Sequence, residues 1–207
     1  KAEWVAKEFA HNESLATEKW NEAEPSFQVL VEPYLQFATQ TSMTVMWHTS
    51  LQASSVVRFG PTDACNRTIE GKASTIHEVV LEGLEPETQY FYRVESRTPA
   101  GTSYLSEPAT FKTAVKKETP YAFAVISDTQ GNPKVSKQIA ELAWGQRPSF
   151  LLHPGDLVST GKNREHWLNH FFPGMRPLIN HVPFYPVLGN HEQNAKHYYD
   201  YVSLPDP

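Results

Sequence analysis

Between residues 25 and 115, polar and apolar positions alternate over short stretches separated by turn residues, a pattern that predicts β-strands. Residues 41–48 form one such strand, with Trp47 on its apolar side, and residues 54–59 form another. Tyr90 follows a Leu-x-Pro-x-Thr sequence, where a phenol hydroxyl can bond back to the preceding turn of a Greek-key sandwich. The pattern therefore predicts an all-β sandwich with Trp47 and Tyr90 in its core.

After residue 119 the rhythm changes to an alternation of strands and helices, which predicts a layered α/β domain. A continuous apolar run at 121–126 predicts a strand buried on both faces. Residues 150–152 predict a second buried strand, and residues 182–188 a third strand. A helix is expected over 163–172, ended by Pro173-Gly174. Another helix is expected between the first two strands, with one apolar face formed by Val135, Ile139, Leu142 and Ala143. We thus divide the chain into a sandwich at 25–116 and an α/β part at 117–207.

Composition excludes several classes of protein. The net charge of -5 lacks the basic footprint of a nucleic-acid binder, and no run approaches the roughly 18 apolar residues that a membrane span needs. Residues 1–24 are charged, with scattered apolar positions, and predict a surface helix or a partly ordered extension. The chain begins at Lys1 rather than Met, so we expect a processed product or an excised piece.

Each predicted α/β strand is followed by a polar signature. Asp128 follows the first strand, Gly155-Asp156 the second, and Gly189-Asn190-His191-Glu192 the third. The carboxyl ends of parallel strands meet at one edge of a sheet, where ligand sites form. Carboxylate, amide and imidazole groups gathered there suit iron, manganese or zinc. The order of the motifs favours a metal site, although Asp128 alone would equally fit a turn cap.

Asp-x-Gln at 128–130, Gly-Asp at 155–156 and Gly-Asn-His-Glu at 189–192 resemble the motifs of the calcineurin-like metallophosphoesterases. The preceding sandwich resembles a fibronectin type III domain, and together they are similar to the purple acid phosphatase group. This resemblance implies two metal ions (Fe, Mn or Zn), with Asp128 on the first, Asp156 bridging both and Asn190 on the second. It implies that His191 protonates the leaving oxygen or stabilises its charge, while a metal-activated hydroxide attacks a phosphate mono- or diester.

The sequence departs from that family at several positions. Ser159 stands where purple enzymes have a tyrosine, so we expect no tyrosinate colour. Gln130 replaces a histidine ligand of many relatives and is a candidate ligand only. The later His and Gly-His-x-His motif of the family do not occur before Pro207, so we expect an incomplete metal site, uncovered apolar surface and an inactive or weakly active chain.

Simpler interpretations accompany the remaining candidates. Glu192 is expected to orient its neighbours rather than bind metal, and His153 to be a core or supporting histidine. The other histidines of the α/β part are expected to lie on the surface or in packing contacts: His166, His170, His181 and His197. The alternative function is a binding or scaffold module with a remnant phosphatase-like domain. The resemblance implies a secreted or periplasmic protein, whereas substrate, metal pair and oligomeric state stay open.

Overall fold

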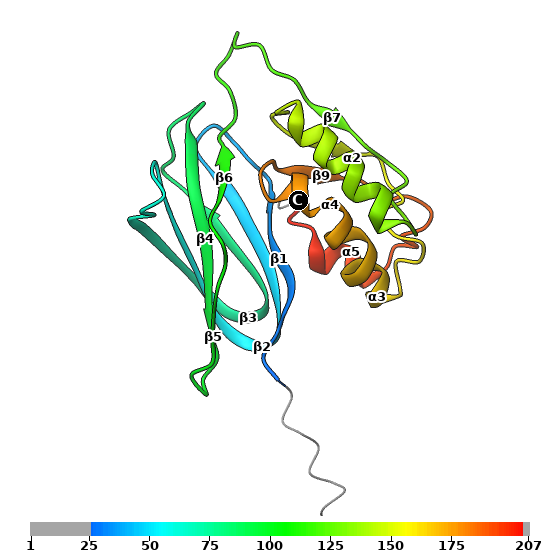
Figure 1. Ribbon diagram of the computed structural model, residues 1–207, viewed down its shortest axis with the longest axis horizontal. Helices are drawn as coiled ribbons and strands as arrows, with labels where there is room; N and C mark the ends of the chain where they lie inside the picture. The colour runs from blue at the N-terminus through cyan, green and yellow to red at the C-terminus, as the bar shows by residue number, and fades with distance from the viewer. Residues whose placement is uncertain (1–25, 205–207) are drawn as a thin grey trace, which may run out of the picture.

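The computed structural model describes residues 26–204, so the predicted N-terminal extension at 1–24 lies outside the described residues. Its first part is a β-sandwich, on the left of Figure 1. The strands run in the order β1-β2-β4-β5, with β3 paired to β2 and β6 paired to β4. Their bounds are β1 Val29–Gln36, β2 Met43–Gly60, β3 Arg67–Leu81, β4 Gln89–Arg97, β5 Ser103–Leu105 and β6 Ala109–Lys112.

The two strands that we predicted at 41–48 and 54–59 form one long strand, β2. Its first half pairs with β1 and its second half with β4, and the register with β3 is irregular between His48 and Ser55. Such irregularities bend a strand. The stretch between the two predicted strands is therefore the bend that carries β2 from one partner to the other.

The sandwich core contains the two aromatic residues that the sequence singled out. Trp47 is fully buried and Tyr90 is 4% exposed. The Tyr90 hydroxyl accepts a hydrogen bond of 2.9 Å from the backbone N–H of Glu85, which is the predicted corner. Trp47 stacks on His77 and donates its indole N–H to Ser96. The predicted β-sandwich is confirmed.

The second part contains a three-stranded parallel sheet in the order β7-β8-β9. Helices α2 and α4 pack against each other beside this sheet, on the right of Figure 1. This arrangement confirms the α/β class. The bounds are β7 Ala124–Val125, α2 Pro133–Gly145, β8 Leu151–His153, α3 Arg164–His166, the π-helix η1 Trp167–Phe171, α4 Phe172–Ile179, β9 Phe184–Pro186 and α5 Lys196–Tyr201.

The predicted burial of these elements is partly wrong. Strands β7 and β9 are shorter than predicted, and β8 is shifted by one residue from the predicted 150–152. Val125 on β7 and Leu152 on β8 are exposed, so neither strand is buried on both faces. Helix α2 buries Ser136 and Ala140 instead of its apolar stripe, because the close contact of Gly174 on α4 with Ser136 admits only small side chains there. Exposed apolar side chains on these strands, on α2 and on the segments next to them include Tyr121, Phe123, Val125, Val135, Ile139, Leu142, Leu152, Val187 and Leu188.

The helical segment after β8 also differs from the prediction. It continues through Pro173-Gly174 to Ile179 instead of ending at that pair. Proline lacks the N–H that would close an α-helical turn onto Asn169. The chain instead forms one π turn before the helix α4 begins, and Phe172 N–H bonds to the carbonyl of Trp167. A proline in the first turn of a helix is tolerated. Pro173 and Gly174 therefore lie in the first turn of α4, which begins at Phe172.

The two parts share a continuous apolar core. Tyr34 and Met46 of the sandwich pack in one cluster with Phe172 and Tyr201 of the α/β part. The Tyr34 hydroxyl donates to the Tyr201 carbonyl at 3.0 Å, and the Tyr92 hydroxyl donates to the Asn180 carbonyl at 2.8 Å. These contacts place the α/β part on one fixed face of the sandwich. Among the described helices none is long and apolar enough to cross a membrane.

Candidate metal centre

The loops that follow the three parallel strands lie at one edge of the sheet. Asp128 follows β7, Asp156 follows β8, and Asn190 and His191 follow β9. Parallel pairing of neighbouring strands brings these ends together, as the sequence predicted. Asp128 and Asn190 are exposed, whereas Asp156 and His191 are half-buried. The four predicted residues therefore border one edge that is open to solvent.

Backbone hydrogen bonds connect the three loops directly. The N–H of His191 donates to Oδ1 of Asp156 at 3.0 Å. The N–H of Asp128 donates to the carbonyl of Gly155 at 3.4 Å. The middle loop is thus bonded to both of its neighbours, with Asp156 at the junction.

The side chain of Glu192 is hydrogen-bonded to the loops after β8 and β9. It is fully buried and accepts hydrogen bonds from four backbone N–H groups: Asp156 at 2.9 Å, Leu157 at 2.7 Å, Val158 at 3.3 Å and Gly189 at 2.7 Å. Its oxygens are therefore occupied by the backbone. This agrees with the interpretation of Glu192 as a residue that orients its neighbours.

Glycines allow the loops to approach at backbone contact distance. A Cβ added to Gly155, whose φ is +109°, would lie 2.8 Å from the backbone of Gly189. A Cβ on Gly189 would overlap the carboxylate and the N–H of Asp156, and one on Gly161 would overlap the carbonyl of Glu192. Only glycine fits at such positions.

Asp128 and Asp156 both adopt left-handed backbone conformations, each with φ of 57°. This conformation is uncommon for residues other than glycine, although aspartate tolerates it better than most. The strain is retained because the surrounding hydrogen bonds determine the loop geometry, and such strain clusters at ligand sites. Asp128 and Asp156 thus follow their strands with the same backbone conformation.

His191 is held by its ring as well as by its backbone. Its Nδ1 lies 2.9 Å from the carbonyl oxygen of Ser159, to which it donates. That hydrogen bond raises the pKa of His191, and the nearby carboxylates of Asp156 and Glu192 act in the same direction. The raised pKa favours the protonated ring, the form that can give a proton to an oxygen.

His153, which we predicted to be a core or supporting histidine, is buried at the end of β8. Its Nε2 lies 3.1 Å from the hydroxyl of Thr129, and that hydroxyl donates to the carbonyl of Leu157. Burial lowers the pKa of His153 to about 4, so the ring is neutral near pH 7. Thr129 and His153 therefore connect the loop after β7 to strand β8 and to the loop that follows β8.

The donor groups fit a hard or borderline cation. Two carboxylates and the amide of Asn190 supply oxygen ligands, and Oε1 of Gln130 is buried with no hydrogen-bond partner among the described residues. An orphaned buried acceptor of this kind is what a bound cation would satisfy. Within residues 26–204, however, no group of three or more His, Cys, Asp or Glu side chains could hold a metal ion. The ligand roles of Asp128, Asp156, Asn190 and Gln130 stay predictions.

Two contributions to this edge could not be found by sequence reasoning. Ser159 acts through its backbone carbonyl, which any residue would supply, so no side-chain pattern marks it. Thr129 lies between two candidate ligands, and its burial against His153 follows only from the fold. Glu192, in contrast, was marked by its place in the Gly-Asn-His-Glu motif.

Comparison with family models assigns both parts of the chain. Residues 31–113 match the model of the purple acid phosphatase N-terminal domain. Residues 121–207 match the model of the calcineurin-like phosphoesterases. Together the two matches include every candidate site residue and both core aromatics of the sandwich.

Curated relatives and solved structures agree with this assignment. The chain is 29% identical over 144 residues to purple acid phosphatase 23 of Arabidopsis thaliana, a match that covers 56% of this chain and 30% of that protein. It is 28% identical over 121 residues to purple acid phosphatase 22 of the same plant, covering 58% of this chain and 25% of that protein. The purple acid phosphatase PPD1 from yellow lupin has the same fold, with a TM-score of 0.69, 16% identity, and coverage of 84% of this chain and 40% of that structure.

Proposed function

Because this chain belongs to the calcineurin-like phosphoesterases and carries the purple acid phosphatase N-terminal domain, we propose that it forms part of a metal-dependent phosphoesterase site. The chain spans about a third of the curated relatives that it matches, so activity and substrate belong to this proposal. The supporting observation is the junction at Gly155-Asp156, where the loop after β8 is hydrogen-bonded to the loops after β7 and β9.

In this proposal Asp128, Asp156, Asn190 and Gln130 hold the metal, for which the resemblance implies two ions of iron, manganese or zinc. A bound ion would supply positive charge to neutralise phosphate oxygens and lower the pKa of water near it. The residues of the chain then fix the geometry, since Glu192 accepts hydrogen bonds from the backbone N–H groups of Asp156 and Gly189 and so joins the loops after β8 and β9.

His191 has the second role in the proposal. Its Nδ1 bond to Ser159 orients the ring and leaves Nε2 free to face a substrate. The raised pKa keeps a proton on the ring further toward neutral pH than an ordinary histidine. We infer that this proton goes to the oxygen of the leaving alcohol when the phosphoester bond breaks, or that the charged ring stabilises that oxygen.

The chain by itself is expected to bind divalent metal weakly and to hydrolyse p-nitrophenyl phosphate slowly. The reason is that residues 26–204 contain no cluster of three charged or imidazole ligands. Turnover should be measured with Mn²⁺, Zn²⁺ and Fe²⁺ in turn, with Asp156→Ala as the matched control. Rapid turnover that disappears in Asp156→Ala would contradict this expectation.

A longer protein that contains this chain is expected to be active and to lose activity in Asn190→Ala and in His191→Ala. Removal of one general acid or electrostatic group typically costs about 10²–10⁴-fold in rate. His191→Ala should lower kcat more for poor leaving groups than for p-nitrophenolate, which needs no proton. Unchanged turnover in both variants would favour the alternative of a binding or scaffold module. Export from the cytoplasm, which the resemblance implies, is part of the same proposal.

A further inference from the structure

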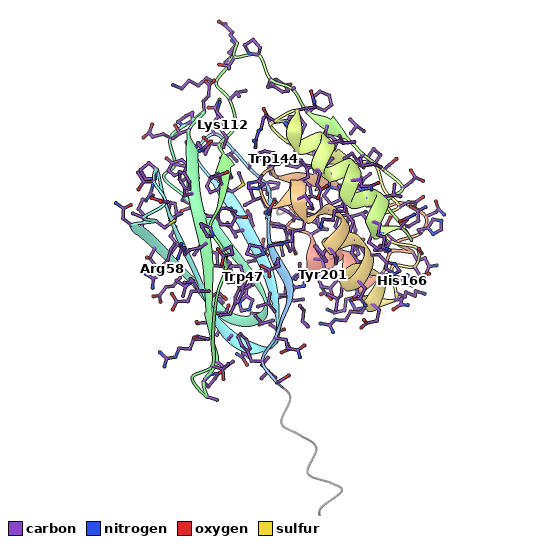
Figure 2. All side chains as sticks on the ribbon, viewed as in Figure 1. Trp47, Arg58, Lys112, Trp144, His166 and Tyr201 are labelled. Atoms are coloured by element: carbon purple, nitrogen blue, oxygen red, sulfur yellow. The ribbon has the colours of Figure 1, made fainter. Side chains whose placement is uncertain are left out.

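Two histidines outside the candidate metal centre lie one turn apart on the helical segment after β8. His166 ends α3 and His170 lies within the π turn η1. Their rings are stacked, with centroids 5.0 Å apart and planes inclined by 17°. Figure 2 shows His166 at the outer side of the α/β part, on the side away from Trp47 in the sandwich. No motif in the sequence joins these two residues, and we expected both to be surface or packing histidines.

The π turn determines how these rings are placed. Pro173 cannot donate to Asn169, so the chain widens by one residue between Trp167 and Phe171. Trp167 and Phe171 are fully buried and fix the opposite side of the turn in the core. Single π turns of this kind occur frequently at functional sites. Two imidazoles four residues apart on a helix form the spacing that binds zinc in metalloproteases.

The ring nitrogens divide into a buried pair and an open pair. Nδ1 of His166 and Nδ1 of His170 are both buried and have no hydrogen-bond partner among the described residues. Neither Nε2 belongs to that buried, unpartnered set, and neither makes a hydrogen bond within residues 26–204. In the neutral tautomer that carries its proton on Nδ1, the lone pair of Nε2 points to solvent. Each of the two stacked rings therefore has an Nε2 lone pair that no described residue occupies.

The neighbouring charges do not block this side. Arg164 is directed toward α5, where its Nε donates to the hydroxyl of Tyr201. Glu165 accepts a hydrogen bond of 2.8 Å from the side chain of Asn169, which adds a carboxylate to the exposed surface of the same helix. A cation near His166 and His170 would thus meet a negative neighbour, while the closest arginine is engaged elsewhere.

We propose that His166 and His170 chelate one borderline transition-metal ion through their Nε2 atoms, with water completing its coordination. Imidazole pairs select zinc, nickel and copper over magnesium and calcium, and copper binds most tightly in the usual order of affinities. A metal–nitrogen distance of about 2.0–2.1 Å requires the two Nε2 atoms to lie about 3–3.4 Å apart. With ring centroids 5.0 Å apart and nearly parallel planes, the proposal requires the two half-exposed side chains to rotate so that both Nε2 atoms face the ion. This site is independent of the Asp156 centre and does not rest on the proposed phosphoesterase function.

The test uses the untagged chain and titrates Ni²⁺ and Zn²⁺ by calorimetry in a buffer that does not bind metals. We expect one nickel per chain, bound at Nε2, and broadening of the His166 and His170 ring signals in the NMR spectrum. His166→Ala and His170→Ala should each weaken this binding by at least about tenfold, since loss of even an outer supporting group costs about 10–100-fold. Asn169→Ala on the same turn and Asp156→Ala in the other centre are the controls and should retain it.

Three results would overturn the proposal. The first is retention of nickel binding by a folded double variant, His166→Ala with His170→Ala. The second is loss of the same binding in Asp156→Ala, which would assign the ion to the other centre. The third is absence of saturable nickel binding by the unaltered chain. Circular dichroism of each variant separates loss of the ligands from loss of the fold.

Discussion

At the scale of single residues, the most informative side chain is one that we do not expect to touch metal or substrate. Glu192 is a fully buried carboxylate, and a buried charge is costly unless hydrogen bonds compensate it. Four backbone N–H groups provide that compensation. They belong to the two loops that carry Asp156 and Asn190, so the stability of Glu192 and the geometry of the candidate centre depend on the same bonds.

We therefore expect Glu192→Ala to destabilise the chain strongly. The substitution leaves four N–H donors without their acceptor, and each buried donor left unpaired costs about 1–3 kcal/mol. Partial entry of water reduces the sum, so we expect a loss of at least about 3 kcal/mol in the free energy of unfolding. Urea titration followed by circular dichroism measures this loss.

Glu165→Ala is the matched control for that substitution. Glu165 is exposed, and within residues 26–204 its carboxylate bonds only to the side chain of Asn169, so its removal should change stability by no more than about 0.5 kcal/mol. Equal effects of the two substitutions would mean that the four backbone bonds do not stabilise the loops.

At the scale of elements, two glycines give opposite expectations for the same substitution. Gly189→Ala places a methyl group on the carboxylate and N–H of Asp156, so the two loops must separate. We expect a loss of at least about 2 kcal/mol, the range of strained or overpacked positions. At Gly145, the last residue of α2, an added methyl meets nothing within 4 Å, and alanine is the better helix former.

Gly145→Ala should therefore stabilise the chain by about 0.5 kcal/mol. Thermal unfolding of Gly189→Ala, Gly145→Ala and the unaltered chain measures both the expected loss and the expected gain of stability. A neutral Gly189→Ala variant would contradict the close approach of the loops after β8 and β9.

The elements also explain which predictions from sequence succeeded. The Tyr90 corner and the order of strands and helices depend on local patterns, and both are confirmed. The apolar stripe of α2 misled us because contact with Gly174 selects the small Ser136 and Ala140 instead. Pro173 was interpreted as a helix end, whereas a π turn lets the helical segment continue past it. In these cases tertiary packing overrode a sound local rule.

The candidate centre, like the fold, could be predicted from the sequence only in part. Candidate residues that a motif marks, such as Asp128, Asp156 and Glu192, could be selected from the sequence. Their shared edge followed from parallel pairing of the strands. The Ser159 carbonyl could not be selected, because backbone groups carry no sequence signal. The stacking of His166 on His170 also depends on a π turn that no periodicity revealed.

At the scale of the whole molecule, buried histidines connect the fold to pH. His48 lies between the two parts, where it contacts the hydroxyl of Tyr34 and the ring of Tyr201. His77 lies inside the sandwich and is bonded to the hydroxyls of Ser55 and Thr49. Burial lowers the pKa of His48 to about 3 and that of His77 to about 4, and the proximity of the two rings and of Arg164 further disfavours charge on His48.

These two histidines should make the chain sensitive to acid. An unfolded chain protonates histidine near pH 6.5, whereas the folded chain keeps both rings neutral down to their lowered pKa values. Between pH 6.5 and about 4 the unfolded state binds more protons, so their contribution to stability is complete above that window and is lost as the pH falls through it. His153, whose pKa burial also lowers to about 4, contributes over the same range, so with three rings the free energy of unfolding should fall by up to about 4.1 kcal/mol per pH unit. Urea titrations at intervals from pH 7 to pH 4.5 measure this slope, which His77→Gln should reduce by up to about a third. A stability that does not change over this range would show that neither ring must stay neutral for the two parts to remain packed.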